Sequence, residues 1–301
     1  MAISEYWISM SRIPNPRTET IQRAQAGDWL ALDEVLRMIQ PGIYALALRM
    51  MGHKEDARDA TQEILLRVTT HLSQFSAQAQ FPTWAYQVAR NHLLNCVTRA
   101  KEAPTYSFED FQKHLDEGLL VANAEQRSHE QLQPEEKLAA KRMGLACTQG
   151  MLMCLDRDQR IAYILDAVLG FDSKQAAEIL QIPAATFRKR LQRARDRLET
   201  FAQKSCGLVS SQASCQCSHQ VAAVQTRFAA GQPIRWQGLA VTKQEAMQVQ
   251  SLWDDMEAAS NITALLRSHP NYQAPENLLA AIRVLLVERF QSSTANPAKP
   301  H

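Results

Sequence analysis

Glycine and proline are scarce in this sequence, and stretches in which apolar and polar residues alternate are nearly absent. Only 10 glycines and 12 prolines occur among 301 residues, which leaves few of the turns that bound short β-strands. Apolar residues instead recur at spacings of three and four, the period of an amphipathic helix. The sequence therefore predicts an all-α protein without internal repeats.

Long apolar runs are also absent. The run LLAAIRVLLV at residues 278–287 is too short and too interrupted by charge to span a bilayer. The opening MAISEYWISMSR lacks the basic, apolar and cleavage regions of a secretory signal. We therefore expect a cytoplasmic protein, whose six cysteines serve as thiols, metal ligands or redox switches rather than as structural disulfides.

The net charge of +2 conceals a separation of charge along the chain. Nine acidic and three basic residues between positions 102 and 137 predict an acidic linker, solvated or only partly helical. Helical patterns lie on both sides of it, and breaks in the first block are expected at residues 40–42, at Gly52 and around residues 78–82. The expected units are residues 15–101, 102–137, 138–204 and 205–295.

The most specific pattern lies in the second helical block. Asp172, with Gln175 three residues on, predicts a capped short helix that ends near Leu180. The sequence QIP then predicts a tight turn before a helix that begins around Ala184. Seven basic and two acidic residues lie between positions 184 and 204. Two helices joined by a short turn, with the second helix basic, are typical of a helix-turn-helix that reads the DNA major groove; a solvated basic face is the alternative.

Candidate DNA-binding residues fall in two segments. Aromatic, amide and cationic side chains at residues 81–101 suit unstacked bases, because rings stack on bases and amides read base edges. A core position is the alternative for the tryptophan of this segment. The candidates are Trp84, Arg90, Asn91, Asn95 and Arg99 there, and Thr186, Arg188, Lys189, Arg190, Gln192 and Arg193 in the helix-turn-helix.

Residues 52–72 predict an amphipathic helix with an acidic polar side. Its apolar side runs through Ala57, Ala60, Ile64, Val68 and Leu72. Such a polar side does not suit DNA phosphates, so it is either solvated or docks a basic protein partner. The polar side consists of Asp56, Asp59, Gln62 and Glu63.

Three cysteines and a histidine crowd the segment SCGLVSSQASCQCSH that follows the basic helix. Cys206, Cys215, Cys217 and His219 offer enough donors for one tetrahedral zinc or another thiophilic metal ion. Their spacing differs from the paired C-x2-C of common zinc folds, and a thiol switch or simple packing remains open. No glutamate stands nearby to act as an acid or base, so no enzyme is expected.

The order of these segments resembles the two conserved domains of the extracytoplasmic function (ECF) sigma factors of bacterial RNA polymerase. The resemblance covers roughly residues 20–204. It rests on EDARDATQEILLRV, FPTWAYQVARNHLLN, PEEKL and LDRDQRIAYILDAVLGFDSKQAAEILQIPAATFRKRLQRARDRL, in that order. A helix-turn-helix regulator that acts without polymerase is the competing interpretation, but it would carry a sensor or dimerising domain in place of residues 20–100.

The resemblance implies a separate role for each domain. The first domain would bind core polymerase through Asp56, Asp59, Gln62 and Glu63, and residues 81–101 would capture the downstream promoter element. The second domain would read the upstream element, and the acidic linker would run along basic channels of the enzyme. The promoter sequence is not readable, because Pro82, Gln175, Ala185 and Phe187 depart from the family's usual residues.

Residues 205–295 extend beyond the resemblance and are expected to form a helical extension. A capping box at residues 242–245 and the sequence APENLL near Pro275 predict two helices. Packing within the chain, regulation of the factor in cis and control by a separate anti-sigma protein are the alternatives. The other cysteines, Cys96, Cys147 and Cys154, are expected to be buried as small hydrophobes. An apolar face that must be covered consists of Leu278, Leu279, Ile282, Leu285, Leu286 and Phe290.

Overall fold

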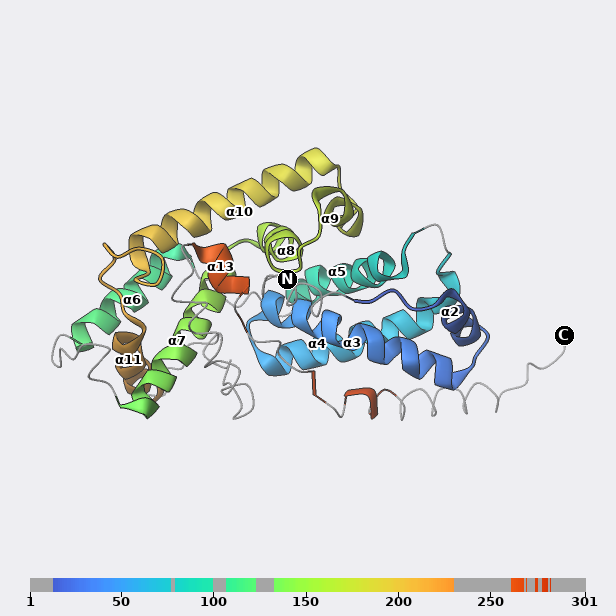
Figure 1. Ribbon diagram of the computed structural model, residues 1–301, viewed down its shortest axis with the longest axis horizontal. Helices are drawn as coiled ribbons and strands as arrows, with labels where there is room; N and C mark the ends of the chain where they lie inside the picture. The colour runs from blue at the N-terminus through green and yellow to red at the C-terminus, as the bar shows by residue number, and fades with distance from the viewer. Residues whose placement is uncertain are drawn as a thin grey trace.

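The computed structural model describes residues 13–76, 79–99, 107–122, 133–229, 261–267, 269, 274, 275, 278–280 and 282. All regular secondary structure in these ranges is helical, which confirms the all-α prediction. None of the described helices has the length and apolarity needed to cross a membrane. Figure 1 shows α2 to α5 on one side, α6, α7 and α11 on the other, and the long α10 across the top.

Four α-helices and a short 3-10 helix (Leu72–Gln74) form the described part of the first domain. The α-helices are α2 (Thr18–Gln25), α3 (Trp29–Met51), α4 (Lys54–His71) and α5 (Phe81–Arg99). The Asp28 carboxylate caps α3 by accepting bonds from the backbone N–H groups of Leu30 and Ala31, at 2.9 and 3.2 Å. Gly52 ends α3 in the left-handed region, with φ of 71°, as the sequence predicted.

The predicted break at residues 40–42 is wrong, because α3 runs through Pro41 and Gly42. Proline removes one helical hydrogen bond, but tertiary packing fixes the backbone here. A Cβ atom at position 42 would lie 2.7 Å from Ile13 Cγ1 and 2.9 Å from the Tyr86 hydroxyl. Close packing around the glycine therefore overrides the local signal.

The predicted acidic linker contains a packed helix, α6 (Phe108–Ala122). Phe111 is fully buried, and its ring lies 5.7 Å from the ring of Phe201. The next helix, α7 (Pro134–Met153), begins inside the same segment with a capping box between Gln133 and Glu136. The segment is therefore partly helical, and its described part belongs to the second half of the fold.

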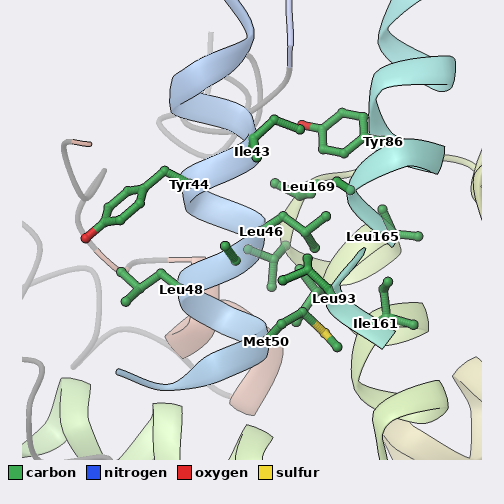
Figure 2. Packing of buried hydrophobic residues seen from close by; sticks show 14 of the residues in the cluster. Ile43, Tyr44, Leu46, Leu48, Met50, Tyr86, Leu93, Ile161, Leu165 and Leu169 are labelled. Atoms are coloured by element: carbon green, nitrogen blue, oxygen red, sulfur yellow. The ribbon is translucent and has the colours of Figure 1, made fainter. Parts of the chain in front are cut away.

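The second domain continues through α8 (Arg157–Tyr163), a π-helical turn (Ile164–Val168), α9 (Ser173–Leu180) and α10 (Ala184–Ser205). Apolar side chains of both domains meet in one core. Figure 2 shows Leu46 of α3 and Leu93 of α5 beside Ile161 and Leu165, and all four are 0% exposed. The two domains therefore pack directly against each other.

Polar bonds tie the end of α3 to the second domain. The Arg160 guanidinium donates to the carbonyl oxygen of Met50 at 2.7 Å, and the Gln149 amide donates to that of Arg49 at 3.0 Å. These carbonyls belong to the last turn of α3, where no partner exists within the helix. Burial lowers the pKa of Arg160 to about 10, so the guanidinium remains a cation at neutral pH.

The extension contributes α11 (Cys217–Ala229) and α13 (Ile262–Arg267). Leu278, Leu279 and Ile282 are buried, which confirms packing of this part of the predicted apolar face within the chain. The predicted capping box at residues 242–245 and the remaining residues of that face, Leu285, Leu286 and Phe290, lie outside the described residues.

Replacing Asp172 with alanine tests the cap of α9. The Asp172 carboxylate accepts bonds from the backbone N–H groups of Lys174 and Gln175, both at 2.8 Å. We expect Asp172→Ala to lower the free energy of unfolding by about 1 kcal/mol, measured by urea denaturation. Asp196→Ala, at an exposed position of α10, is the control and should change it by less than about 0.5 kcal/mol. Equal losses in both variants would contradict the assigned cap.

Candidate nucleic-acid and protein interfaces

The helix-turn-helix has the predicted local geometry. The helix α9 ends at Leu180, Gln181 adopts the left-handed region with φ of 53°, and α10 begins at Ala184. The predicted apolar stripe of α10 is buried and fixes the helix on the domain. It consists of Phe187, Leu191, Ala194, Leu198 and Phe201.

Five of the seven basic residues of α10 form two groups, one paired with carboxylates and one exposed near the N-terminal half of the helix. Arg190 pairs with Asp158 at 3.0 Å, and Arg195 pairs with Asp166 at 2.5 Å. These pairs hold α10 against α8 and the turn that follows it. The other group is exposed and makes no ion pair within the described part of the chain. This second group, called the basic face below, consists of Arg188, Lys189 and Arg193.

The remaining candidates on α10 flank the basic face. Thr186 is half-buried in the first turn. Gln192 is exposed and donates to the Asp196 carboxylate at 2.7 Å. Arg190 is half-buried by its ion pair, so it is oriented toward its own domain rather than outward.

The predicted amphipathic helix α4 has one buried and one acidic side. The residues of its predicted apolar side are all buried. Asp59 and Glu63 are exposed, whereas Asp56 and Gln62 are half-buried. Arg58 lies 3.2 Å from Asp59, but the Asp59 side chain is still 68% exposed. The four polar residues, called the acidic face below, are therefore accessible on the surface of the first domain.

The aromatic residues of α5 belong mostly to the core. Phe81 and Tyr86 are 1% and 0% exposed, so neither presents a ring face to a base. Trp84 is half-buried, and its ring lies 5.4 Å from Phe75 and 5.5 Å from Phe81. Trp84 thus anchors an aromatic cluster and keeps only part of its surface accessible.

The polar candidates on α5 lie near the second domain. Asn91 and Asn95 are exposed. Arg90 donates to the Asn91 side chain at 2.6 Å and to the side-chain oxygen of Gln181, in the turn after α9, at 3.4 Å. The side chain of Arg99 lies outside the described residues.

A polar cavity lies between α2 and the start of α5, and sequence reasoning missed it. Its volume is about 450 Å³. The Gln25 side-chain amide of α2 donates to the carbonyl oxygens of Leu72 and Phe75, both at 2.9 Å. These bonds fix one side of the cavity. The lining includes Thr18, Gln22, Gln25, Phe75 and Gln80. These residues are scattered along the sequence and form no recognisable motif, so the sequence did not predict the cavity.

The structure gathers three of the four predicted metal-ligating residues, with a different fourth residue. Cys206, Cys215 and Cys217 line a small cavity together with Cys147 of α7, whereas His219 is not part of its lining. The cavity has a volume of about 20 Å³, enough for one water-sized particle. These four cysteines are called the thiol cluster below.

Local packing explains the shape of the cysteine loop. The backbone N–H of Gly207 donates to the carbonyl oxygen of Cys215 at 3.1 Å, and a Cβ atom at position 207 would collide with that oxygen. Cys147 and Cys154 are 8% and 3% exposed, which confirms their predicted burial. The side chain of Cys96 lies outside the described residues.

The thiols of this cluster are held in their neutral form. Burial raises the pKa of Cys147 and Cys217 well above the ordinary value and that of Cys215 to about 12. Burial also raises the pKa of Cys206. Low thiolate content disfavours a reactive redox thiol. As arranged, no three His, Cys, Asp or Glu side chains within the described ranges could hold a metal ion.

Two segments of the chain match known family models. Residues 35–102 match Sigma-70 region 2, and residues 145–198 match Sigma-70, region 4. The first match contains the acidic face and α5, and the second contains the helix-turn-helix. Both matches end before the cysteine loop.

Curated relatives align over the same part of the chain. The ECF RNA polymerase sigma factor SigW of Bacillus subtilis is 26% identical over 178 residues, which cover 59% of this chain and 92% of SigW. The sigma factor SigM of the same organism is 29% identical over 172 residues, covering 57% and 95%. The RNA polymerase sigma-H factor of Pseudomonas aeruginosa is 25% identical over 189 residues, covering 62% and 93%.

Two solved structures resemble the chain at lower identity. The sigma factor RpoE, in complex with the anti-sigma factor NepR from Bartonella quintana, has a TM-score of 0.38 and 20% identity, covering 56% of this chain and 95% of that one. CnrH, in complex with the cytosolic domain of CnrY, has a TM-score of 0.41 and 19% identity, covering 60% and 92%.

The raised thiol pKa values predict low chemical reactivity. At pH 8 we expect the thiol cluster of the folded chain to react with an aromatic disulfide reagent at least about tenfold more slowly than in the urea-unfolded chain. The absorbance of the released thiolate measures the rate. Ser211→Cys, at an exposed position of the same loop, is the control and should react rapidly. Reaction of the native cysteines at the control's rate would contradict their burial.

Proposed function

The chain belongs to the ECF sigma factors, and from this membership we propose that it directs core bacterial RNA polymerase to specific promoters. One observation carries the proposal: Sigma-70 regions 2 and 4 occur in one chain in that order, the first with the acidic face and the second with the basic face. Factors of this family act by binding rather than by catalysis, and we assign no catalytic residue. The site of action is the cytoplasm, where the polymerase works.

The acidic face is the proposed docking site for core polymerase. Asp59 and Glu63 are exposed and carry like charge on one side of α4. Complementary charge on the partner steers encounter and penalises wrong partners. Asp56 and Gln62, which are half-buried, complete the face.

The basic face is the proposed reader of the upstream promoter element. Arg188, Lys189 and Arg193 are unpaired by carboxylates in the described structure, so they are available to phosphates and base edges. Thr186 and Gln192 flank them near the N-terminal half of α10. Arg190, through its ion pair with α8, contributes by orienting the helix.

The α5 helix is the proposed site for the opened downstream strand. Asn91 and Asn95 are exposed amides that suit base edges, and Trp84 offers part of a ring for stacking. Arg90 and Arg99 supply positive charge for the phosphate backbone. The polar cavity beside Phe75 and Gln80 provides space for one unstacked base.

A helix-turn-helix regulator that works without polymerase is the second candidate. It accounts for α9 and α10 but gives no role to the Sigma-70 region 2 match at residues 35–102. The two functions differ in one simple respect. A sigma factor associates with core polymerase in the absence of DNA, whereas a regulator of the other kind binds its operator in the absence of polymerase.

The thiol cluster is the proposed site of a thiophilic metal ion that regulates the factor in cis. Four thiols suit tetrahedral zinc, and the cavity of about 20 Å³ admits one ion. The sulfurs do not form a metal-binding group as arranged, so binding requires Cys206, Cys215 and Cys217 to converge with Cys147. An ion there would connect α7 and α10 to the extension. A separate anti-sigma protein is the alternative mode of control.

Charge reversal tests polymerase docking. We expect Asp59→Lys combined with Glu63→Lys to weaken association with core polymerase at least about tenfold, because the face becomes repulsive to a basic partner. Fluorescence anisotropy of the labelled chain with core polymerase measures it. The matched variant, Arg188→Ala with Arg193→Ala, should keep its affinity for core polymerase but lose run-off transcription from genomic fragments. Failure of the wild-type chain to bind core polymerase would reject the sigma-factor proposal itself.

Metal content tests the thiol cluster. Protein purified without chelator should carry close to one equivalent of zinc or copper by mass spectrometry, because the ion would displace the thiol protons when the four sulfurs converge on it. Replacing Cys147, Cys206, Cys215 and Cys217 with serine should remove it. The control His219→Ala should retain the metal, since His219 does not line the cavity. Less than a tenth of an equivalent in the wild-type chain would assign the cysteines to packing.

A further inference from the structure

The helix α9 covers one side of α5. The Gln87 side-chain amide donates to the carbonyl oxygen of Glu178 at 3.0 Å, and Arg90 reaches the side chain of Gln181. Beside them, the ring of Tyr86 meets the ring of Phe171 edge to face at 5.2 Å. A nucleic-acid strand that lay along this side of α5 would have to displace α9.

Gln181 occupies a backbone position that favours glycine. Its φ of 53° makes it the sole non-glycine residue with a positive φ in the described ranges, and helices that end in this conformation usually carry glycine there. Glutamine adopts this backbone conformation less readily than glycine does. Its side-chain oxygen, however, accepts a hydrogen bond from Arg90. The residue choice therefore favours contact between the two domains over local backbone preference.

The interface behind this contact is apolar and buried. Leu46 and Leu93 of the first domain and Ile161, Leu165 and Leu169 of the second are all 0% exposed and point toward one another (Figure 2). The bonds from Arg160 and Gln149 complete the last turn of α3. Separation of the domains would expose these side chains and leave two backbone carbonyls without those partners.

The extension contacts both domains. On the second domain, Thr263 of α13 bonds Tyr163 at 2.8 Å, and Arg267 donates to the carbonyl oxygen of Ala167 at 2.5 Å. On the first domain, the carbonyl oxygen of Pro275 accepts a bond from Gln40 at 3.3 Å. Described residues of the extension therefore contact both sides of the junction; α13 and Pro275 are together called the strap below.

We propose that the chain rests in a closed, autoinhibited form in which the turn after α9 holds Arg90 on the nucleic-acid side of α5, next to the exposed Asn91 and Asn95, and the strap holds the two domains together. The proposal rests on the proposed function, since it concerns how a sigma factor is kept from promoter DNA. Arg90 binds the second domain in the closed form and is withheld from the downstream strand. Transcription therefore requires the domains to separate.

Two variants test the closed form in the full chain. The latch variant combines Gln87→Ala with Gln181→Gly; it removes both side-chain contacts, and glycine suits the backbone at 181. Loss of two hydrogen bonds shifts the equilibrium toward the open form by about tenfold. The strap variant, Leu265→Glu, places a charge at a fully buried position of α13. Leu120→Glu, at a leucine that is 74% exposed, is the matched control.

The readouts separate conformation from activity. Energy transfer between dyes on non-natural amino acids at the exposed positions 34 and 204 reports domain separation. Run-off transcription from genomic fragments with limiting core polymerase reports activity. We expect both variants to lose transfer efficiency and to transcribe several-fold more than the wild-type chain, while the control matches the wild type. Circular dichroism checks that each variant is folded.

Two results would overturn the closed form. One is a free wild-type chain whose transfer efficiency does not change when core polymerase is added. The other is a pair of variants that are open but transcribe no better than the wild type. Either result leaves the sigma-factor proposal intact as long as the wild-type chain binds core polymerase. Loss of that binding would instead reject the proposed function.

Discussion

A buried guanidinium joins the two domains of this sigma factor. Arg160 donates to the carbonyl oxygens of Leu152, Met153 and Leu155 in its own domain and to that of Met50 in the other. Its desolvation is offset only by these bonds, because a buried charge without partners is strongly unfavourable. Three of the four bonds lie within the second domain. Opening therefore breaks only one of the four Arg160 bonds, worth about 1.5–3 kcal/mol, and this cost adds to that of exposing the apolar side chains between the domains.

Charge is distributed so that each surface suits one kind of partner. The acidic face lies on α4 and the basic face on α10, on different domains and on different sides of the shared core. Arginines that would extend the basic face along α10 are neutralised by Asp158 and Asp166. The basic face lies in the N-terminal half of α10, where a helix-turn-helix meets base edges.

Local signals in the sequence predicted local structure well. The cap at Asp172, the stripe that includes Phe187 and the end of α3 at Gly52 each depend on residues close together in the chain. The predicted break at Pro41 failed because its outcome depends on distant packing around Gly42. For the same reason no pattern indicated that Cys147 would join the cysteine loop, nor that α9 would cover α5.

Together, the proposed docking of core polymerase at the acidic face and the proposed closed form imply an order of events in holoenzyme assembly. Asp59 and Glu63 are accessible while the domains are packed together, so polymerase can dock on the closed chain before α9 leaves α5. Docking is then a concentration-dependent step and separation a first-order step that follows it. The observed rate of assembly would rise with polymerase concentration and level off at the rate of domain separation. A chain that had to open before docking would instead show a rate that falls with concentration toward the opening rate.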